Sequence, residues 1–327
     1  MIPQKRWEKS LQEAITDPAE LLKALALDDK LLPDARRAAD LFPLKVPLSY
    51  VNRIQPGNRH DPLLLQVLPI VDELIVHPDY TADPLNEKAA NPVPGLLHKY
   101  PGRVLLTFVG TCAINCRYCF RRQFPYAENN PGRGWDQALA YIAQDTTICE
   151  VILSGGDPLI APDKLLTAFS EKLSRIPHVR RLRIHTRLPI VMPERITAQF
   201  LKWIGELKFQ TILVVHCNHA QEINDEVSQG LSAIKAAGVT LLNQSVILKG
   251  VNNSVAALQD LSEGLFKAGV QPYYLHLLDK VSGSAHFDIP KAEAILLHQK
   301  LTAQLSGFLV PKLVFEEAGA LSKMPVF

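Results

Sequence analysis

The sequence lacks long hydrophobic runs and has little net charge. No stretch of its 327 residues approaches the roughly 20 consecutive apolar residues that a membrane-spanning helix needs. The N-terminal segment is charged throughout and has no apolar region of the kind found in secretory signals. Its 35 Lys and Arg against 33 Asp and Glu leave a formal charge of +2, too balanced for a dedicated nucleic-acid binder. These absences predict a soluble cytoplasmic protein with neither a membrane nor a nucleic acid as partner.

Cysteine is scarce as well, and its distribution is uneven. There are five cysteines, an odd number that argues against a secreted disulfide framework. Cys112, Cys116 and Cys119 have the spacing C-x3-C-x2-C, whereas Cys149 and Cys217 stand alone and suit packing as small hydrophobes. Buried thiols or a zinc ion are alternatives for the triplet, but structural zinc usually takes four ligands. Three thiolates can instead hold a [4Fe–4S] cluster and leave one iron open for a ligand, which is the interpretation we favour.

The chain has two regions of different composition. Residues 1–95 contain two short helical patterns and then many prolines, and Asp17 before Pro18 is a predicted helix N-cap. We expect this region to form a helical, Pro-rich arm. In residues 96–327, apolar strand patterns alternate with amphipathic helical patterns, and the strands recur about every 30 residues. The expected strands lie within 104–110, 150–157, 179–187, 210–218, 239–248 and 271–279. Six near-continuous apolar strands of this kind predict an α/β fold with an open or partial (βα) barrel.

Polar residues stand where each of these six strands ends. In parallel α/β folds, ligands bind at the carboxyl ends of the strands. The positions are Cys112, Ser154-Gly155-Gly156-Asp157, His185-Thr186-Arg187, His216, Gln244 and Asp279. We therefore expect these side chains to form the rim of one active site.

The cysteine triplet, with an aromatic residue before its last cysteine, resembles the signature of radical S-adenosylmethionine enzymes. The usual fold of that family is a partial (βα)6 barrel. The resemblance implies that Cys112, Cys116 and Cys119 hold a [4Fe–4S] cluster. It also implies that Ser154-Gly155-Gly156-Asp157, at the end of the second expected strand, binds the amino group of S-adenosylmethionine. Glycines at that point allow the backbone to approach a ligand closely.

A narrower resemblance extends from about residue 83 to the C-terminus. Seven blocks resemble, in order, the lysine 2,3-aminomutase family of radical enzymes that use pyridoxal phosphate. They are DPLNEKAANPVPGLLHKYPGRVLL, CAINCRYCFRR, LSGGDPL, HTRLPIVMPERIT, VVHCNHAQEIN, LNQSVILKGVNN and PYYLHLLD. The resemblance implies that a 5′-deoxyadenosyl radical starts the migration of an amino group from the α-carbon to the β-carbon of lysine. Fold, cofactors and chemistry then agree with the cysteine motif.

The resemblance also assigns residues to pyridoxal phosphate. Lys323 would form the aldimine with this cofactor. A lysine so near the C-terminus is usually a solvated surface charge, but the residues around it are apolar and indicate packing against the barrel. The cofactor phosphate would be held by Lys99, Tyr100 and Arg103, and two cations with a phenol suit a dianion.

Further residues are assigned to the substrate and to S-adenosylmethionine. Arg121 matches the arginine that pairs with the substrate carboxylate, although a surface arginine is the alternative. Asp279 and Glu316 match the two acidic positions that bind the distal ammonium of lysine. The family typically has Asp where this chain has Glu316. His216 and Gln244 match positions that line the S-adenosylmethionine site, unless they are ordinary polar groups at strand ends.

The chain resembles most the short family members that make (R)-β-lysine for elongation factor P. In those systems a lysyl-tRNA-synthetase-like ligase attaches the product to that factor. The implied partners are free L-lysine, this modification pathway and an unidentified electron donor. Two alternatives remain: an aminomutase for another amino acid such as glutamate, and a non-catalytic iron–sulfur adaptor of elongation factor P.

Overall fold

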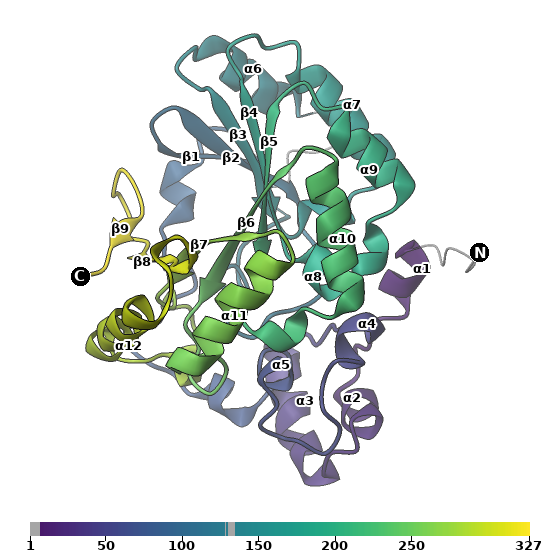
Figure 1. The fold of residues 1–327 in the computed structure, drawn as a ribbon, viewed down its shortest axis with the longest axis vertical. Helices are drawn as coiled ribbons and strands as arrows, with labels where there is room; N and C mark the ends of the chain where they lie inside the picture. Colours follow the sequence, from purple (N-terminus) through teal and green to yellow (C-terminus); the bar gives the residue numbers. More distant parts are fainter. Residues whose placement is uncertain (1–6, 128, 130–134) are drawn as a thin grey trace.

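A computed structural model describes residues 7–127, 129 and 135–327, and a single curved sheet is its centre (Figure 1). In the described residues the sheet has nine strands in the order β1 to β9. They are β1 (Leu96–Tyr100), β2 (Arg103–Val109), β3 (Glu150–Gly155), β4 (Arg181–Thr186), β5 (Gln210–His216), β6 (Thr240–Val246), β7 (Gln271–His276), β8 (Lys312–Phe315) and β9 (Met324–Pro325). The six strands expected from the sequence are β2 to β7, and they are confirmed.

Neighbours in this sheet are also neighbours in sequence, as in a barrel. Strands β2 to β8 pair in parallel, whereas β1 and β9 pair antiparallel with β2 and β8 at the two edges. Among the described residues no pairing joins β9 back to β1, so the sheet is curved but not closed. The fold is therefore α/β with a partial barrel, as the sequence predicts.

The two faces of the sheet differ in polarity. In β4, Leu182 and Ile184 are fully buried, whereas Arg183 and His185 are partly exposed and line a cavity on the other face. The same alternation of period two runs through β3, where Glu150 and Ser154 line the cavity and Val151 and Leu153 are buried. These strands are therefore apolar on the side of the helices and polar on the side of the cavity. The sequence-based description of the strands as near-continuous apolar runs misses this difference between the two faces.

Helices cover the apolar face and one end of the sheet (Figure 1). Those of the barrel are α6 (Asp136–Gln144), α7 (Asp163–Leu173), α8 (Leu188–Val191), α9 (Ala198–Gly205), α10 (Asp225–Ala236), α11 (Val255–Lys267) and α12 (Lys291–Gln304). The amphipathic helical patterns expected between the strands are confirmed in α7, α9, α10 and α11. Every helix in the described part of the chain is too short or too polar to cross a bilayer.

The arm packs against the end of the barrel rather than standing apart from it. Its helices are α1 (Trp7–Gln12), α2 (Pro18–Ala24), α3 (Leu32–Leu41), α4 (Leu48–Val51) and α5 (Pro62–Leu65). The Asp17 side chain accepts a hydrogen bond from the Ala19 amide, which confirms the predicted N-cap of α2. Buried arm residues such as Leu21 and Leu64 belong to the same hydrophobic cluster as Leu153 and Val215 of the sheet. A boundary at residue 95 therefore stays a prediction.

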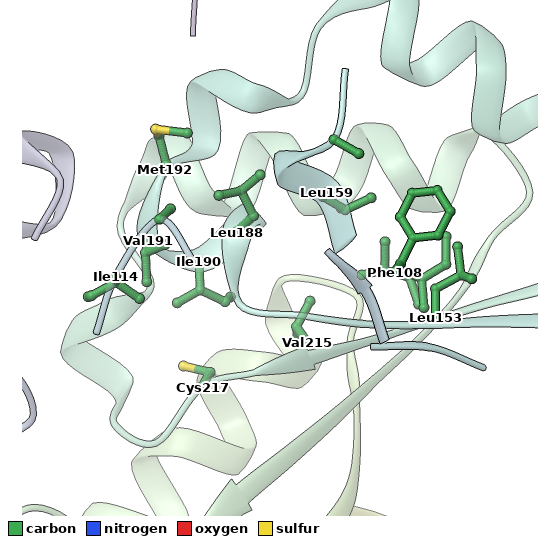
Figure 2. Close-up of a cluster of buried hydrophobic side chains, with 14 of the residues drawn as sticks. Phe108, Ile114, Leu153, Leu159, Leu188, Ile190, Val191, Met192, Val215 and Cys217 are labelled. Atoms are coloured by element: carbon green, nitrogen blue, oxygen red, sulfur yellow. The ribbon is translucent and has the colours of Figure 1, made fainter. Parts of the chain in front are cut away.

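That cluster continues to the cysteine loop. Figure 2 shows part of it, with Ile114 from the loop after β2 near Ile190 and Val191 of α8, and Phe108 beside Leu153. Cys217 is fully buried in the same cluster, as expected of a small hydrophobe. Apolar packing thus holds the segment between Cys112 and Cys116 against the barrel.

Candidate active site

The polar face of the sheet lines a cavity of about 360 Å³. Ten of the residues to which the resemblance assigns a role meet there: Lys99, Tyr100, Arg103, Arg121, Ser154, His216, Gln244, Asp279, Glu316 and Lys323. They come from five strands, β1, β2, β3, β5 and β6, and from the connections that follow β2, β7 and β8. Residues up to 224 positions apart in the chain (323 minus 99) therefore share one space. Their convergence supports the roles predicted for them, which remain proposals.

Glu316 occupies a central position among the basic groups of this cavity. Its Oε1 lies 3.0 Å from Lys99 Nζ and its Oε2 lies 2.9 Å from Lys323 Nζ. Burial opposes ionisation of Glu316, but Lys323 and Lys99 outweigh it and lower its pKa. One carboxylate thus connects the lysine predicted to bind pyridoxal phosphate covalently with a lysine predicted to bind its phosphate.

Asp279 follows β7 and has the opposite electrostatic setting. Burial and the neighbouring carboxylate of Glu316 raise its pKa from 3.8 to about 7, although Lys323 and Lys99 act against the shift. The two acids are therefore not equivalent: Glu316 is held as an anion, while Asp279 titrates near neutral pH. A cation placed between them would remove the repulsion and favour the charged form of both.

Arg121 is bound by a carboxylate of the arm. Its Nε donates to Glu87 Oε2 at 2.7 Å and its Nη2 donates to Glu87 Oε1, also at 2.7 Å. Its Nη1 donates to Ser154 Oγ at 3.1 Å. Lys99 Nζ contacts the same Glu87 at 3.0 Å. The guanidinium fork expected to bind the substrate carboxylate is thus already engaged along one edge. Nη1, beside Ser154 at the cavity wall, is the part of Arg121 left to face a ligand.

Three buried histidines supply polar atoms that need partners. The Nε2 atoms of His185, His216 and His276 are buried and have no hydrogen-bond partner in the described structure. Burial is the main cause that lowers the pKa of each, so the imidazoles are neutral near pH 7. Unpaired buried polar atoms are rare in folded proteins, and here they line the cavity. Together with Lys99, Arg103 and Arg183, they fit a polar, anionic ligand such as the phosphate of pyridoxal phosphate.

The cysteine loop follows β2 and brings its three thiols together. Burial and the neighbouring sulfurs raise the pKa of Cys112, and the same causes raise that of Cys119 to about 11. Among the described residues, no group of three His, Cys, Asp or Glu is arranged to hold a single metal ion. A cluster needs a different arrangement, because each cysteine binds a separate iron. Lys45 lies near Cys112, Arg122 near Cys119, and Arg187 donates to Cys116 Sγ at 2.7 Å. This basic surrounding fits an anionic cluster.

The arm clamps this loop from outside. Arg117 is fully buried, and its guanidinium donates to Glu73 Oε1 at 2.8 Å, to Glu73 Oε2 at 2.6 Å and to the Phe42 carbonyl at 2.7 Å. The amide of Arg117 donates to the Gln66 carbonyl and that of Asn115 to the Lys45 carbonyl, both at 2.9 Å. Buried ionic contacts of this kind need several satisfied partners, and Arg117 has them.

The glycine segment after β3 has a packing role at the loop. A Cβ on Gly156 would lie 2.2 Å from the Thr111 carbonyl oxygen, and Gly155 adopts φ +105° against β2. These glycines let the backbone before Cys112 lie directly on β3. Asp157 is buried, and its carboxylate accepts hydrogen bonds from Thr186 Oγ1 and from the amides of Leu159 and Arg187. Of the four residues predicted to bind S-adenosylmethionine here, Ser154 lines the cavity, and the others support the loop and the strand ends.

Several cavity residues were not predicted from the sequence. Glu87, Glu150, Arg183, Tyr273 and Tyr274 line the same space. Arg183 Nη2 lies 2.5 Å from Glu150 Oε1, and Lys323 Nζ lies 5.7 Å from the centre of the Tyr274 ring. The alternation of residues within β3 and β4 could have identified Glu150 and Arg183, whereas the adjacent Tyr273 and Tyr274 both line the cavity and break the alternation in β7. Glu87 begins a 3-10 helix of four residues (Glu87–Ala90), which is too short to show a periodic pattern.

One family model and several solved structures are similar to parts of this chain. Residues 99–180 match the model of a 4Fe-4S single cluster domain, which includes all three loop cysteines. The chain is also similar in structure to a radical SAM methyltransferase from Sphaerobacter thermophilus, with a TM-score of 0.48, 18% identity and 71% of each chain covered.

Curated sequences give a stronger similarity over nearly the whole chain. L-lysine 2,3-aminomutase of Escherichia coli (strain K12) is 49% identical over 98% of this chain and 94% of its own length. The enzyme of the same name from Clostridium subterminale is 34% identical over 98% of this chain and 77% of its own length. The chain therefore belongs to the L-lysine 2,3-aminomutase family, radical enzymes that use a [4Fe–4S] cluster, S-adenosylmethionine and pyridoxal phosphate.

Proposed function

We propose that this enzyme converts L-lysine to (R)-β-lysine and supplies it for the modification of elongation factor P. One observation supports the substrate most: a single cavity contains an arginine, a lysine and two carboxylates, Arg121, Lys323, Asp279 and Glu316. Lysine carries a carboxylate at one end and an ammonium at the other, and this cavity offers both complementary charges. The similarity to lysine aminomutases over almost the whole chain supports the same reaction.

The proposed roles within the cavity follow from charge and position. Lys323 binds pyridoxal phosphate covalently, and Lys99, Tyr100 and Arg103 hold its phosphate. Arg103 lies 4.6 Å from the centre of the Tyr100 ring, so the two side chains form one surface. Glu316 neutralises Lys99 and Lys323 and keeps both lysines at the cavity wall.

The substrate is proposed to lie between Arg121 and the acidic pair. Arg121 offers Nη1 to the carboxylate, with Ser154 beside it. Asp279 and Glu316 accept the distal ammonium, and binding of that cation favours ionised Asp279 over its protonated form. A glutamate side chain would add a third carboxylate to this pair, so the same contacts disfavour an acidic substrate.

The cofactors supply the difficult chemistry, and the chain supplies position and exclusion of water. When bound, the cluster and S-adenosylmethionine provide a carbon radical, and pyridoxal phosphate provides an electron sink for the migrating group. Cys112, Cys116 and Cys119 are proposed to hold the cluster, and Ser154, His216 and Gln244 to contact S-adenosylmethionine from the cavity wall. Gly155, Gly156 and Asp157 position the loop against them.

The experiment is an anaerobic incubation of cluster-containing protein with S-adenosylmethionine, pyridoxal phosphate, dithionite and isotope-labelled L-lysine. Chiral derivatisation and mass spectrometry would separate the α-lysine and β-lysine enantiomers. We expect (R)-β-lysine, and its loss in Lys323→Ala and Cys116→Ala. Formation of 5′-deoxyadenosine without β-lysine from protein of full iron content would contradict lysine as the substrate, and labelled glutamate would then be tested in the same assay.

A second experiment addresses elongation factor P. The factor is incubated with its lysyl-tRNA-synthetase-like ligase, ATP and either α-lysine or the reaction mixture of this enzyme. We expect modification in intact-mass spectra to depend on the active reaction mixture. If Lys323→Ala supported the modification as well as wild type in cells, the enzyme proposal would fail and a non-catalytic adaptor would be favoured.

A further inference from the structure

Behind the cysteine loop lies a buried polar network to which the proposed function assigns no role. Its centre is Arg187, which follows β4 and is 6% exposed. Its Nη1 donates to Cys116 Sγ at 2.7 Å. Its Nη2 donates to Gln66 Oε1 at 2.7 Å and to Glu222 Oε2 at 2.9 Å. The guanidinium therefore joins one cysteine of the triplet to two distant parts of the chain.

The partners of Arg187 are themselves held firmly. Glu222 Oε1 accepts from the amides of Asn218 and His219 at 2.9 and 3.1 Å, and from Gln66 Nε2 at 3.2 Å. Gln66 belongs to the arm, and its carbonyl also accepts the amide of Arg117 in the cysteine loop. The guanidinium cannot turn away from Cys116 without breaking several buried bonds. The arm thus fixes the direction in which Arg187 points.

One nitrogen of Arg187 remains without a partner. Its Nε is buried and makes no hydrogen bond within the described structure, although the other two nitrogens are engaged. A buried N–H with no acceptor is costly unless an acceptor is present in the functional state. The atom belongs to the same guanidinium that contacts the cysteine, so a second donor stands close to the place where an iron–sulfur cluster would be held.

The physical consequence concerns electron transfer. A cluster gains one negative charge when it is reduced, and donors to its cysteine sulfurs stabilise that charge. A guanidinium has a fixed positive charge, and at a buried site it acts without strong screening by water. Glu222 offsets part of that charge at 2.9 Å.

We propose that Arg187, held in place by Glu222 and by Gln66 of the arm, sets the reduction potential of the cluster bound at Cys116. Arg187 is a positioning residue, since it acts through the cysteine. The proposal depends on the assignment of the cluster to Cys112, Cys116 and Cys119, but not on the identity of the substrate. It also gives the arm a role in the chemistry of the cluster.

The test is a redox titration of the cluster, followed by electron paramagnetic resonance under anaerobic conditions, without lysine or pyridoxal phosphate. Arg187→Met removes the donor and the charge, so the variant should be harder to reduce. We expect the equilibrium constant for reduction to fall about tenfold, which corresponds to about 59 mV for a one-electron couple. Glu222→Gln removes the offsetting carboxylate and should shift the potential in the opposite direction.

Matched variants separate this effect from a general loss of structure. Arg53 lies in the same region and donates to the Glu222 and Val191 carbonyls, and it has no hydrogen bond to a cysteine sulfur in the described structure. Arg53→Met should change the equilibrium constant by less than threefold. If Arg187→Met fails to retain iron, the reduction potential of Glu222→Gln tests the proposal instead. The proposal is overturned if Arg187→Met keeps its iron with an unchanged potential, or if Glu222→Gln is harder to reduce than wild type. Wild-type protein that binds no cluster would instead contradict the cysteine assignment.

Discussion

Replacing Asp279 by Asn should make the protein more stable, by an amount that depends on pH. Burial and Glu316 raise the pKa of Asp279 to about 7 in the folded protein, compared with 3.8 as its ordinary value. The folded state therefore binds more protons than the unfolded state between these two values, and wild-type stability falls as pH rises through that window. Asn carries no charge at any of these pH values and avoids the penalty.

The magnitude follows from the two pKa values. Across the whole window the shift corresponds to about 4 kcal/mol, because each pKa unit is worth about 1.4 kcal/mol. Between pH 5 and pH 8, where most proteins stay folded, the free energy of unfolding of Asp279→Asn should exceed that of wild type by a margin that grows by about 2.5 kcal/mol. Above pH 8 the difference should level off, since Asp279 is then ionised in both states.

The assay is urea denaturation of both proteins between pH 5 and pH 8.5, without pyridoxal phosphate or lysine, because both ligands would alter the field at Asp279. Titrations common to both proteins cancel in the difference. A stability difference that is constant with pH, or that shrinks as pH rises, would refute the reasoning. Asp288→Asn is a suitable control, because this carboxylate lies outside the cavity and accepts a hydrogen bond from Tyr80.

Three further predictions follow from contacts at the site. Glu87→Gln leaves the buried Arg121 without its carboxylate partner, whereas Lys99 keeps Glu316, and it should lower stability by about 3 to 5 kcal/mol in urea unfolding; an unchanged unfolding midpoint would contradict the importance of this contact. Gly156→Ala places a methyl group against the Thr111 backbone and should lower iron content per protein, whereas Gly307→Ala, where the added carbon meets open space, should not. Lys323→Ala should lose the pyridoxal phosphate that borohydride reduction attaches covalently to wild type, and a label found on another lysine peptide in wild type would disprove the assignment.

The sequence predicts the barrel well because its strands and helices repeat. Strands β2 to β7 and helices α7, α9, α10 and α11 each bury an apolar face whose period is visible in the residues. The edge strands β1 and β9 and the neighbouring β8 are short, and helix α12 has no clear apolar face, so local patterns carry less information about them. Their formation depends on the neighbouring strand or helix, which is distant in sequence.

The candidate site, like the fold, could be predicted from the sequence only in part. Lys99, Arg121, Asp279 and Lys323 were expected from a family pattern, and they line one cavity. The engagement of Arg121 by Glu87 could not be predicted, because the two residues lie 34 positions apart and no periodic pattern connects them. The sequence can therefore identify the residues of the site by their match to a family pattern. The tertiary structure decides which charged residues pair with one another.

The clamp of the arm on the cysteine loop has a consequence for biogenesis. Residues 38–73 leave the ribosome before Arg117 and Arg122, yet Glu73 and the carbonyls of the arm have these arginines as their buried partners. These buried arm groups therefore gain their partners only after the barrel segment has been made. Once Arg117 is enclosed, the loop is covered from the arm side. Cys112, Cys116 and Cys119 nevertheless stay partly exposed with the arm in place, so docking of the arm orients the loop without sealing its thiols from iron and sulfide.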